Sequence, residues 1–431
     1  MNLRNAVRTI PVLLLSALSS GAPAFAAESV TTAVRCAAAI DVTGGKRIDR
    51  AVLLVREGRI VAIGPDLPIP EGATVVDLGD AIVVPGLIDS HTHLLLRFDP
   101  GLGDENANFL TMLSTLGPDG RVLLGAAMAR EMLEAGFTTV RDLGNSGPHG
   151  AVALRDAIRS GWVPGPRLIV STRAIAPPGG QFGRLTVLGR PFAREEYVEV
   201  TGVDAARAAV REAVFDGASV IKVIVDGTVS LSLAELEAIV DEAHRAGVKV
   251  AAHAVADAAA RLAARAGVDS IEHAYSAPDD VLRMMAEKKI FLVPTDFPPE
   301  SGVGSPEQVA AERKRLARAV ALGVPIAAGS DIYYAQRGKT RGESAKLMLR
   351  AYAASGMTPA QILRAATLDA ARLLGVDKDT GTLEPGKYAD LLAVDGDPLA
   401  DIRALERVRT VMMAGVAVAR EATARPAGNN R

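Results

Sequence analysis

Six residues of the types that bind metal ions or carry protons lie within or at the ends of apolar runs of this sequence. His91 and His93 follow such a run, and residues two apart point to the same side of a strand. Lys222 lies inside another run, where burial of an unpaired ammonium group is costly. Three more residues close later runs: His253, His273 and Asp331. This distribution predicts that the six side chains meet at one site.

Taken singly, each of these residues has an ordinary structural explanation. A lone buried histidine is more often a hydrogen-bonded core residue than a ligand, and the stem of Lys222 can lie along apolar surface while its amine reaches water. Taken together, four imidazoles, one carboxylate and one amine would repel one another or stay unsatisfied without a cation. Zinc accepts imidazole and carboxylate ligands, so the set predicts a metal centre. Asp89 shares the face of His91 and His93 and is a candidate partner of a ligand.

These side chains converge only if parallel strands carry them to one edge of a sheet. In residues 85–372 short buried strands alternate with amphipathic helices, several of which end at a glycine. The predicted strands are Leu87–Leu94, Thr138–Leu143, Arg167–Ile175, Val220–Asp226, Lys249–Val255, Ser270–Tyr275, Ile290–Asp296 and Pro325–Asp331. The predicted helices are Arg121–Ala135, Ala205–Phe215, Leu233–Ala246, Ala256–Ala266, Asp279–Lys288 and Pro306–Leu322.

Eight strand–helix units predict an α/β protein with a (β/α)8 TIM-type barrel over residues 85–372. In such a barrel the six residues would line the mouth formed by the carboxyl ends of the strands, where active sites of this fold lie. The alternative is an open doubly wound sheet. No Gly-x-Gly-x-x-Gly turn follows the first predicted strand, and no dinucleotide site is evident.

The segments on either side of the predicted barrel have a different pattern. Residues 27–84 contain short β-like runs, two of which are separated by Glu57-Gly58, a pair typical of a hairpin turn. Residues 373–425 contain similar runs, at Asp390–Val394 and Val408–Met413, separated by turn residues. We expect the two segments to form one small β-sandwich, with the barrel inserted between them.

The composition narrows the function classes. The 431 residues are 49% hydrophobic and 23% charged, which is typical of a folded globular protein. The formal net charge of -2 offers no basic excess, so nucleic acid is not an expected partner. The single cysteine, Cys36, excludes an intramolecular disulfide and a cysteine-rich zinc module. A homo-oligomer is compatible with this composition, and the sequence does not set its order.

The first 26 residues have the pattern of a secretory signal peptide. Arg4 and Arg8 form a positive start, Ile10–Leu18 is a short apolar segment, and Ala24-Phe25-Ala26 is a cleavage site of small residues. An uncleaved anchor is the alternative. No later run offers about 18 uninterrupted apolar residues, so we expect a periplasmic or secreted protein without membrane contact after cleavage.

Several motifs of this sequence resemble those of the amidohydrolase superfamily, and the resemblance covers nearly the whole chain after the signal peptide. It is most similar to the imidazolonepropionase-like branch, which includes Xaa-Pro dipeptidases, Xaa-Arg carboxypeptidase-like enzymes and ochratoxin-type amide hydrolases. The matching motifs are Val84–His93, Gly217–Lys222, the histidines 253 and 273, Gly329–Asp331 and Gly381–Leu391; Val140–Asp142, Pro164–Arg167 and Gly179-Gly180 also match.

The resemblance implies two divalent metal ions, in the first instance zinc, and assigns their ligands. It places one metal on His91, His93 and Asp331 and the second on His253 and His273. Lys222, carboxylated by CO2, would bridge both metals. A plain ammonium group has no lone pair to offer a metal, whereas a carbamate supplies two anionic oxygens.

One position departs from the resemblance. Many dipeptidases of this branch have histidine in a Gly-Gly-His-Gly motif where this chain has Gln181. A glutamine can donate a hydrogen bond to a substrate carbonyl but cannot ionise. Gln181 and Tyr275 are therefore candidates for contact with the oxyanion, and Arg184 or another arginine at the mouth is a candidate for binding a substrate carboxylate.

The mechanism implied is hydrolysis of an amide by a metal-bridged hydroxide. The two metals lower the pKa of the bridging water, and Asp331 takes its proton and delivers it to the leaving amine. The predicted activity is cleavage of a peptide or peptide-like amide, as in a dipeptidase, a carboxypeptidase or an N-acyl amino acid hydrolase. The alternatives are a cyclic-amide hydrolase or a deaminase and, outside enzymes, a catalytically silent barrel that acts as a scaffold or binding protein. Lys222 counts against a deaminase, and the complete ligand set counts against a silent scaffold.

Overall fold

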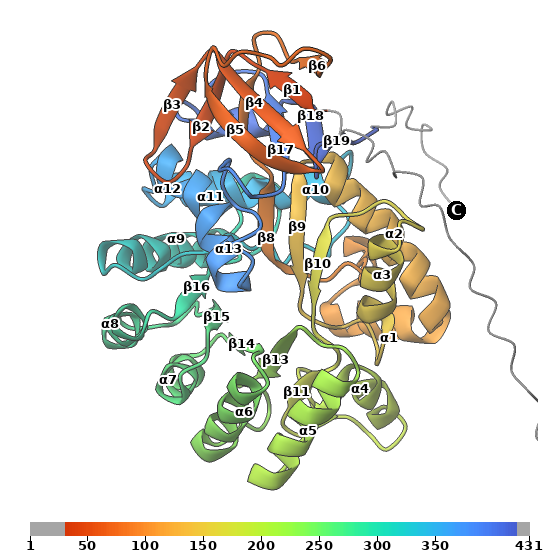
Figure 1. Cartoon of the computed structure of the whole chain (residues 1–431). Coiled ribbons are helices and arrows are strands. Elements are labelled where there is room, and N and C mark those ends of the chain that lie inside the picture. Colours follow the sequence, from red (N-terminus) through yellow and green to blue (C-terminus); the bar gives the residue numbers. More distant parts are fainter. Residues whose placement is uncertain (1–30, 420–431) are drawn as a thin grey trace, which may run out of the picture.

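A computed structural model describes residues 31–419 of the chain. Two antiparallel-rich sheets at one end of the molecule are built from both ends of the described chain, and the middle of the chain forms parallel strands with helices around them (Figure 1). The predicted signal peptide, residues 1–26, and residues 420–425 of the last predicted segment lie outside the described residues. No described helix is long and apolar enough to cross a membrane.

The two terminal sheets have the strand orders β5-β4-β1-β6 and β19-β18-β17-β7-β2-β3. Their strands are β1 Thr32–Arg35, β2 Ala38–Asp41, β3 Lys46–Asp49, β4 Ala51–Arg56, β5 Arg59–Pro65, β6 Thr74–Asp77, β7 Ile82–Pro85, β17 Leu391–Val394, β18 Val408–Met413 and β19 Val416–Ala417. Residues of both sheets, such as Leu53 and Leu391, share one cluster of buried side chains. Strand β7 pairs with β17 across more than 300 residues of sequence, so the two ends of the chain fold together.

The predicted hairpin of the N-terminal segment is confirmed. Strands β4 and β5 pair in antiparallel fashion, and only Glu57 and Gly58 separate them. Both residues have positive φ, 51° and 75°, as the tight turn that suits the twist of two paired strands requires. Glycine adopts this conformation without strain, which is why it follows Glu57.

The middle of the chain contributes two parallel sheets, with the orders β10-β9-β8 and β12-β11-β13-β14-β15-β16. Their strands are β8 Leu87–Thr92, β9 Phe137–Asp142, β10 Arg167–Val170, β11 Ala174–Ala176, β12 Tyr197–Glu199, β13 Val220–Ile224, β14 Lys249–Ala254, β15 Ser270–His273 and β16 Phe291–Val293. Most of their side chains are buried on both faces, as parallel strands covered by helices require.

Backbone hydrogen bonds join the two parallel sheets at both edges. The N–H of Ser219, directly before β13, donates to the carbonyl of Val170 in β10 at 2.8 Å. On the other side, residues 325–331 lie between β16 and β8: the N–H of Ala327 donates to Leu292, and the N–H of Ser90 donates to Ala328. The segment that carries Asp331 is thereby fixed beside the strand that carries His91 and His93.

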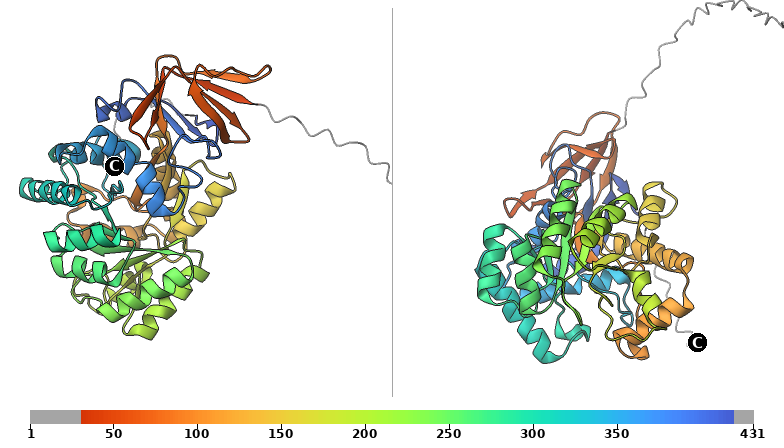
Figure 2. Two further views of the ribbon diagram at one scale, coloured as in Figure 1. Left: turned by 60° about the vertical axis from the view of Figure 1, so that its left-hand side comes forward. Right: turned by 90° about the horizontal axis from the view of Figure 1, so that it is seen from below.

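Helices lie outside the strands, as Figures 1 and 2 show for α5 to α9. The helices are α1 Glu105–Thr115, α2 Pro118–Glu134, α3 Gly150–Arg159, α4 Arg190–Glu196, α5 Val203–Phe215, α6 Leu233–Arg245, α7 Asp257–Ala266, α8 Asp279–Lys288, α9 Pro306–Ala321, α10 Arg341–Ala345, α11 Leu347–Ala354, α12 Pro359–Ala365 and α13 Leu368–Leu374; three short 3-10 helices are Pro100–Leu102, Pro299–Ser301 and Ile402–Glu406. Helix α6 shows why such a helix begins where it does: the N–H of Glu235 donates to the hydroxyl of Ser232, and the N–H of Ser232 donates to the carboxylate of Glu235.

Most predicted strands are present with ends shifted by one to three residues, and two of them are not continuous strands in the structure. Arg167–Ile175 is not one strand, because β10 and β11 are separated at residues 171–173. Pro325–Asp331 forms only an isolated bridge at Ile326. In that segment the N–H of Ser330 donates to the side chain of Asp89 instead of a neighbouring strand, and Asp331 has a φ of 51°, outside the β region.

Candidate metal centre

The first pair of predicted ligands lies at the end of β8. His91 and His93 point to the same side, and their Nε2 atoms are 3.3 Å apart. Both imidazoles are buried. Burial holds the pKa of His91 well below its usual value, so that its ring stays neutral. Burial would lower the pKa of His93, but the adjacent carboxylate of Asp331 outweighs burial and raises the pKa.

Asp331 lies beside these two histidines. Its Oδ1 is 3.4 Å from His91 Nε2 and 3.2 Å from His93 Nε2, and no hydrogen bond satisfies this buried oxygen. Burial alone would raise the pKa of Asp331, but His91, His93 and Lys222 outweigh it and lower the pKa, which keeps the carboxylate ionised. Among the described residues, His91, His93 and Asp331 form a group whose ligand atoms all lie within 4.8 Å of one another.

The position of Asp331 is set by its neighbours in sequence. Asp89 accepts hydrogen bonds from the N–H of His91 and from the N–H and the hydroxyl of Ser330. This confirms the predicted partnership of Asp89 with the site. A Cβ at Gly329 would lie 2.3 Å from Val293 and 2.9 Å from the Cβ of His91, so only glycine lets this segment approach β8.

Lys222, in β13, completes one side of the cluster. Its Nζ is 3.5 Å from His91 Nε2, and its side chain is buried, so the alternative of an amine that reaches water is wrong. Burial lowers the pKa of Lys222 to about 8, although Glu272 and Asp331 oppose this shift. A lowered pKa makes the neutral amine accessible at neutral pH, and only the neutral amine can react with CO2.

The arrangement of these atoms fits a zinc ion. Zinc bonds to nitrogen and oxygen of about 2.0–2.1 Å in a tetrahedron place neighbouring ligand atoms about 3.3–3.4 Å apart. The separations between Nε2 of His91, Nε2 of His93 and Oδ1 of Asp331 run from 3.2 to 3.4 Å. The unsatisfied oxygen of Asp331 supplies the negative charge that such an ion requires.

His253 and His273, at the ends of β14 and β15, lie next to this cluster. Their ring centroids are 4.6 Å apart, and the ring of His273 is 5.3 Å from that of His91. Burial lowers the pKa of His253 to about 4 and that of His273 well below its usual value, so both rings are neutral and able to act as ligands. The structure thus brings all six predicted residues to one place.

Two further charged residues support the cluster and were not predicted to belong to it. Glu272 is fully buried, lies 2.8 Å from Nδ1 of His91 without the alignment of a hydrogen bond, and forms an ion pair with Arg141. Arg141 also donates to the carbonyl of Ser90. Each is a charged residue inside a segment predicted to be a buried strand, and this signal could have identified them in the sequence.

The two predicted oxyanion contacts lie beside the second pair of histidines. Nε2 of Gln181 is 3.4 Å from each ring nitrogen of His253. The hydroxyl of Tyr275 is 2.8 Å from Oγ1 of Thr295, which also lies 2.8 Å from Nδ1 of His273. Thr295 was missed in the sequence, because nothing in its surroundings separates it from an ordinary strand-end threonine.

A cavity of about 860 Å³ opens onto the cluster and is lined by all six predicted ligands, Gln181 and Tyr275. The chain contains nine phenylalanines, six tyrosines and one tryptophan, and seven of these sixteen residues line the cavity: Phe109, Phe182, Tyr197, Tyr275, Phe297, Tyr333 and Tyr334. Its cationic lining residues besides Lys222 are Arg337 and Lys339, whereas Arg184 is not part of the lining.

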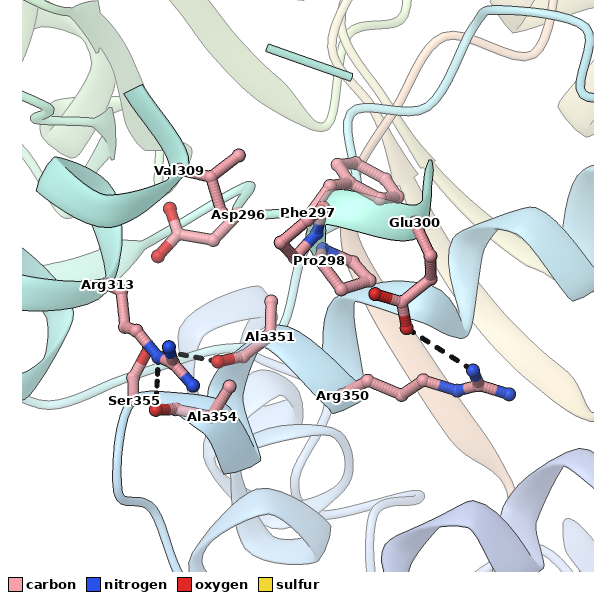
Figure 3. A pocket seen from close by; sticks show the side chains of 11 residues that line it. Asp296, Phe297, Pro298, Glu300, Val309, Arg313, Arg350, Ala351, Ala354 and Ser355 are labelled. Atoms are coloured by element: carbon pink, nitrogen blue, oxygen red, sulfur yellow. Dashed lines mark hydrogen bonds and ion pairs between the residues drawn. The ribbon is translucent and has the colours of Figure 1, made fainter. Parts of the chain in front are cut away.

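A second, smaller pocket of about 230 Å³ lies between α9 and α11 (Figure 3). Phe297 and Glu300 contribute to both cavities, so one short segment forms the partition. In the small pocket Arg350 contacts Glu300, and Arg313 donates to the carbonyl of Ala354. Asp296, which also lines this pocket, pairs with the buried Arg315, and the six predicted ligands line the larger cavity.

Comparison with known proteins agrees with this geometry. Residues 82–418 match the model of the amidohydrolase family. Ochratoxinase of Aspergillus niger is 30% identical over 411 residues, covering 85% of this chain and 82% of that protein. Imidazolonepropionase of Deinococcus deserti is 28% identical over 391 residues, covering 86% of this chain and 93% of that protein.

Solved structures give the same result. A crystal structure of a Xaa-Pro dipeptidase with methionine bound in its active site aligns with a TM-score of 0.78 at 28% identity, over 90% of this chain and 99% of that one. The crystal structure of the A. niger ochratoxinase aligns with a TM-score of 0.74 at 28% identity, over 90% and 96% of the two chains. The chain belongs to the amidohydrolase family. It is therefore a hydrolase of carbon–nitrogen bonds of the amide type.

Proposed function

We propose that this protein is a secreted binuclear-metal amidohydrolase that cleaves a peptide or peptide-like amide bond. The observation that carries the proposal is the spacing of 3.2–3.4 Å among Nε2 of His91, Nε2 of His93 and Oδ1 of Asp331, beside the buried amine of Lys222. His91, His93 and Asp331 would hold one zinc ion, and His253 and His273 the second.

Lys222 would bridge the two ions as a carbamate. Its neutral amine forms a bond to the carbon of CO2 and loses one proton, which leaves two oxygens that share one negative charge. Burial of the amine and its lowered pKa of about 8 favour the reactive form. Replacing an ammonium charge by a carbamate also removes the repulsion between Lys222 and two cations.

We propose for the fold that the two parallel sheets close into a (β/α)8 barrel over residues 85–372. The hydrogen bonds at both sheet edges, from Ser219 to Val170 and from Ser90 to Ala328, support this closure. The terminal segments, residues 27–84 and 373–425, would form a β-sandwich, which the buried cluster common to both terminal sheets supports.

In the proposed reaction, bound zinc supplies Lewis-acid polarisation of the substrate carbonyl and acidifies water. Asp331, ionised because the neighbouring histidines and Lys222 lower its pKa, takes the proton of the attacking water and delivers it to the leaving amine. Gln181, beside His253, donates a hydrogen bond to the carbonyl oxygen of the substrate, and the hydroxyl of Tyr275 is a second polar group near this oxygen.

The cavity lining favours substrates with a large apolar or aromatic group. Seven aromatic side chains surround the space next to the metal ligands. Along one wall the rings of Tyr333, Phe98, Phe109 and Phe182 follow one another at centroid distances of 4.9–5.5 Å. A contact between such a ring and an aromatic group of the substrate would stabilise the bound substrate by about 0.5–1.5 kcal/mol. Arg337 and Lys339 are placed to attract a substrate carboxylate.

We propose that residues 1–26 direct the protein to the periplasm or the medium as a cleaved signal peptide, because their positive start, apolar segment and small-residue site fit one. The partners proposed are small amides, without nucleic acid or membrane, and a homo-oligomer is compatible with the chain. Purification from the periplasmic fraction and the medium, followed by mass measurement of the N-terminus, tests this assignment.

The decisive experiment combines metal analysis with a substrate panel. We expect about two zinc ions per chain and release of amine from dipeptides, N-acyl amino acids or aryl-amide conjugates. Asp331→Asn, prepared in parallel, should lose most of this activity and thereby excludes a contaminating peptidase. One zinc ion per chain together with release of ammonia would favour a deaminase. A preference for substrates whose ring is opened would favour a cyclic-amide hydrolase. No zinc after metal-supplemented refolding would favour a silent scaffold.

A further inference from the structure

A chain of hydrogen bonds ends at the side-chain amide of Gln181. Nδ2 of Asn145 donates to the hydroxyl of Tyr197 at 3.4 Å, and that hydroxyl donates to Oε1 of Gln181 at 3.0 Å. Nε2 of Gln181, on the other side of the same amide, is 3.4 Å from both ring nitrogens of His253. The amide thus has its oxygen toward Tyr197 and its N–H groups toward the cavity.

The backbone around Gln181 is shaped to receive the ring of Tyr197. A Cβ at Gly180 would lie 2.3 Å from Cδ2 of Tyr197, so the ring packs directly against the glycine backbone. Gly180 also has a φ of 58°, which glycine adopts without strain. One residue earlier, the N–H of Gly179 donates to Glu199, two positions after Tyr197 in β12. The loop before Gln181 and the strand of Tyr197 are therefore fixed to each other.

The far end of the chain is anchored by a buried ion pair. Arg121 and Glu196 are 2 % and 0 % exposed and pair at 2.6 Å. Arg121 also donates to the carbonyl of Asn145, and Glu196 directly precedes Tyr197 in the sequence. Breaking such a buried pair is strongly unfavourable, so Asn145 and Tyr197 have little freedom to move.

The direction of these hydrogen bonds follows from the chemistry of the groups. Burial raises the pKa of Tyr197, so its hydroxyl keeps its proton at every working pH. Asn145 already donates to this hydroxyl, and the one proton of the phenol is free for Oε1 of Gln181. The side-chain amide of Gln181 therefore cannot rotate by half a turn without losing its hydrogen bond from Tyr197.

We propose that Tyr197 is a positioning residue that holds the amide of Gln181 with its N–H groups toward the cavity, where they bind the carbonyl oxygen of the substrate as negative charge develops. This inference rests on the proposed amide hydrolysis and extends it to how the donor is oriented. A donor fixed in advance stabilises developing charge without reorganisation during the reaction. Because an amide does not ionise, this donor is equally effective across the working pH range.

The test compares Tyr197→Phe, Gln181→Met and the double variant with the unchanged zinc enzyme on the best amide of the panel. Loss of one oxyanion donor lowers kcat by about 10²–10³, which we expect for Gln181→Met. Tyr197→Phe leaves the donor present but free to turn, so we expect a fall in kcat of about 10-fold with KM changed less than about 2-fold. The double variant should be no slower than Gln181→Met.

Matched controls separate orientation from folding. Tyr388→Phe removes a hydroxyl from the terminal sheets, far from the cavity lining, and should retain full kcat. Zinc content should be unchanged in Tyr197→Phe, and thermal unfolding should show that the variant, although less stable, is folded at the assay temperature. A phosphonamidate analogue of the substrate, titrated by calorimetry, should bind more weakly to Tyr197→Phe by the same factor as kcat falls.

If Tyr197→Phe fails to fold, Gln181→Glu provides the test. Gln181 is exposed at the cavity, so this change should not prevent folding. The glutamate carboxylate has the same shape as the amide but accepts hydrogen bonds where the amide donates them. We expect this variant to be slower than Gln181→Met. Equal kcat in Tyr197→Phe and the parent, or additive losses in the double variant, would overturn the inference while amide hydrolysis stands. If the parent releases no amine from any amide, the proposed function itself is wrong, and this inference falls with it.

Discussion

At the scale of single residues, Lys222 is the most informative side chain of the site. It is 4 % exposed, lies 3.5 Å from a nitrogen of His91 and has a pKa of about 8. We expect Lys222→Ala to lose the second zinc ion and most activity, because no bridge then joins the two sites. Added acetate or propionate should restore part of both, since a short carboxylate fits the vacated space. Zinc analysis and rate measurements with and without the acid check this.

The outcome that contradicts the bridging carbamate is a Lys222→Ala protein with two zinc ions and normal turnover. Lys249→Ala serves as a matched control. This lysine lies in the neighbouring strand β14, but its Nζ reaches the backbone of Arg372 and does not line the cavity. Its removal should leave zinc content unchanged and show no response to acetate.

Glu312 makes the stability of the protein depend on pH. Burial and the charge of Asp296 raise its pKa to about 7, against the partial compensation of Arg315. Between about pH 4.5 and pH 7 the folded state holds more protons than the unfolded state, so stability falls as pH rises through this window. Glu312→Gln lacks this dependence and should gain stability relative to the parent at pH 8 but not at pH 4.5. Urea unfolding at the two pH values measures the difference.

Glu287→Gln, at an exposed position of α8, controls for the loss of a negative charge. If the free energy of unfolding of Glu312→Gln differs from that of the parent by the same amount at both pH values, Glu312 is not the source of the pH dependence.

Residue types and their places in apolar runs predicted that the six side chains meet at one site, and in the structure all six line one cavity. Their assignment to two metal ions came from the family resemblance. The supporting charges were harder to predict. Glu272 and Arg141 belong to β15 and β9, which lie in two different sheets, and their contact depends on how these sheets face each other, which one sequence does not reveal. The link from Thr295 to His273 likewise depends on backbone geometry, since both have positive φ, 59° and 73°.

At the scale of elements, α1 forms the aromatic wall of the cavity. Phe109 of this helix packs edge-on against Phe98 and Phe182, at centroid distances of 4.9 and 5.5 Å. We expect Phe109→Ala to lower kcat/KM for amides of phenylalanine about 3- to 10-fold more than for amides of alanine, since only the larger group uses the wall. Steady-state rates with paired substrates measure this ratio.

Phe215→Ala is the control for Phe109→Ala, because Phe215 is 90 % exposed and does not line the cavity. It should leave both rates unchanged. If the two amides lose equal factors in Phe109→Ala, α1 shapes the cavity in general and does not select the substrate.

Elements with a regular pattern were predicted well. The predicted bounds of α8 agree with the structure, and those of α6 and α9 differ from it by one residue at one end. The prediction was wrong for residues 171–173, which separate β10 from β11, and for residues 325–331, where the N–H groups of Gly329 and Ser330 donate to the side chains of Tyr352 and Asp89. Helix α1 was not predicted, because its apolar residues follow the cavity instead of a buried sheet.

At the scale of the whole molecule, a buried carboxylate joins the terminal sheets to the parallel strands. Asp390 is 2 % exposed and accepts hydrogen bonds from Arg167 of β10, from Thr380 and from the N–H of Ala414. Asp390→Ala leaves these donors without a partner and should lower the free energy of unfolding by about 3 kcal/mol. Urea unfolding at pH 7 measures this loss.

The exposed ion pair of Asp379 and Arg59 provides the comparison for Asp390→Ala. Asp379→Ala should cost less than about 1 kcal/mol, as is usual for solvated pairs. Equal losses in the two variants would mean that Asp390 does not hold the two parts of the molecule together.

The direct passage from β7 into β8 has a practical consequence. Strand β8 begins beside the terminal sheets and ends at His91 and His93, and a strand of six residues spans about 20 Å. Both ends of the described chain lie in the terminal sheets, so a carrier protein or an affinity handle joined directly after residue 419, or before residue 31 in place of the predicted signal peptide, starts beside these sheets and not at the metal ligands. The enzyme is thereby suited to attachment on a solid support with its substrate entrance facing the solution.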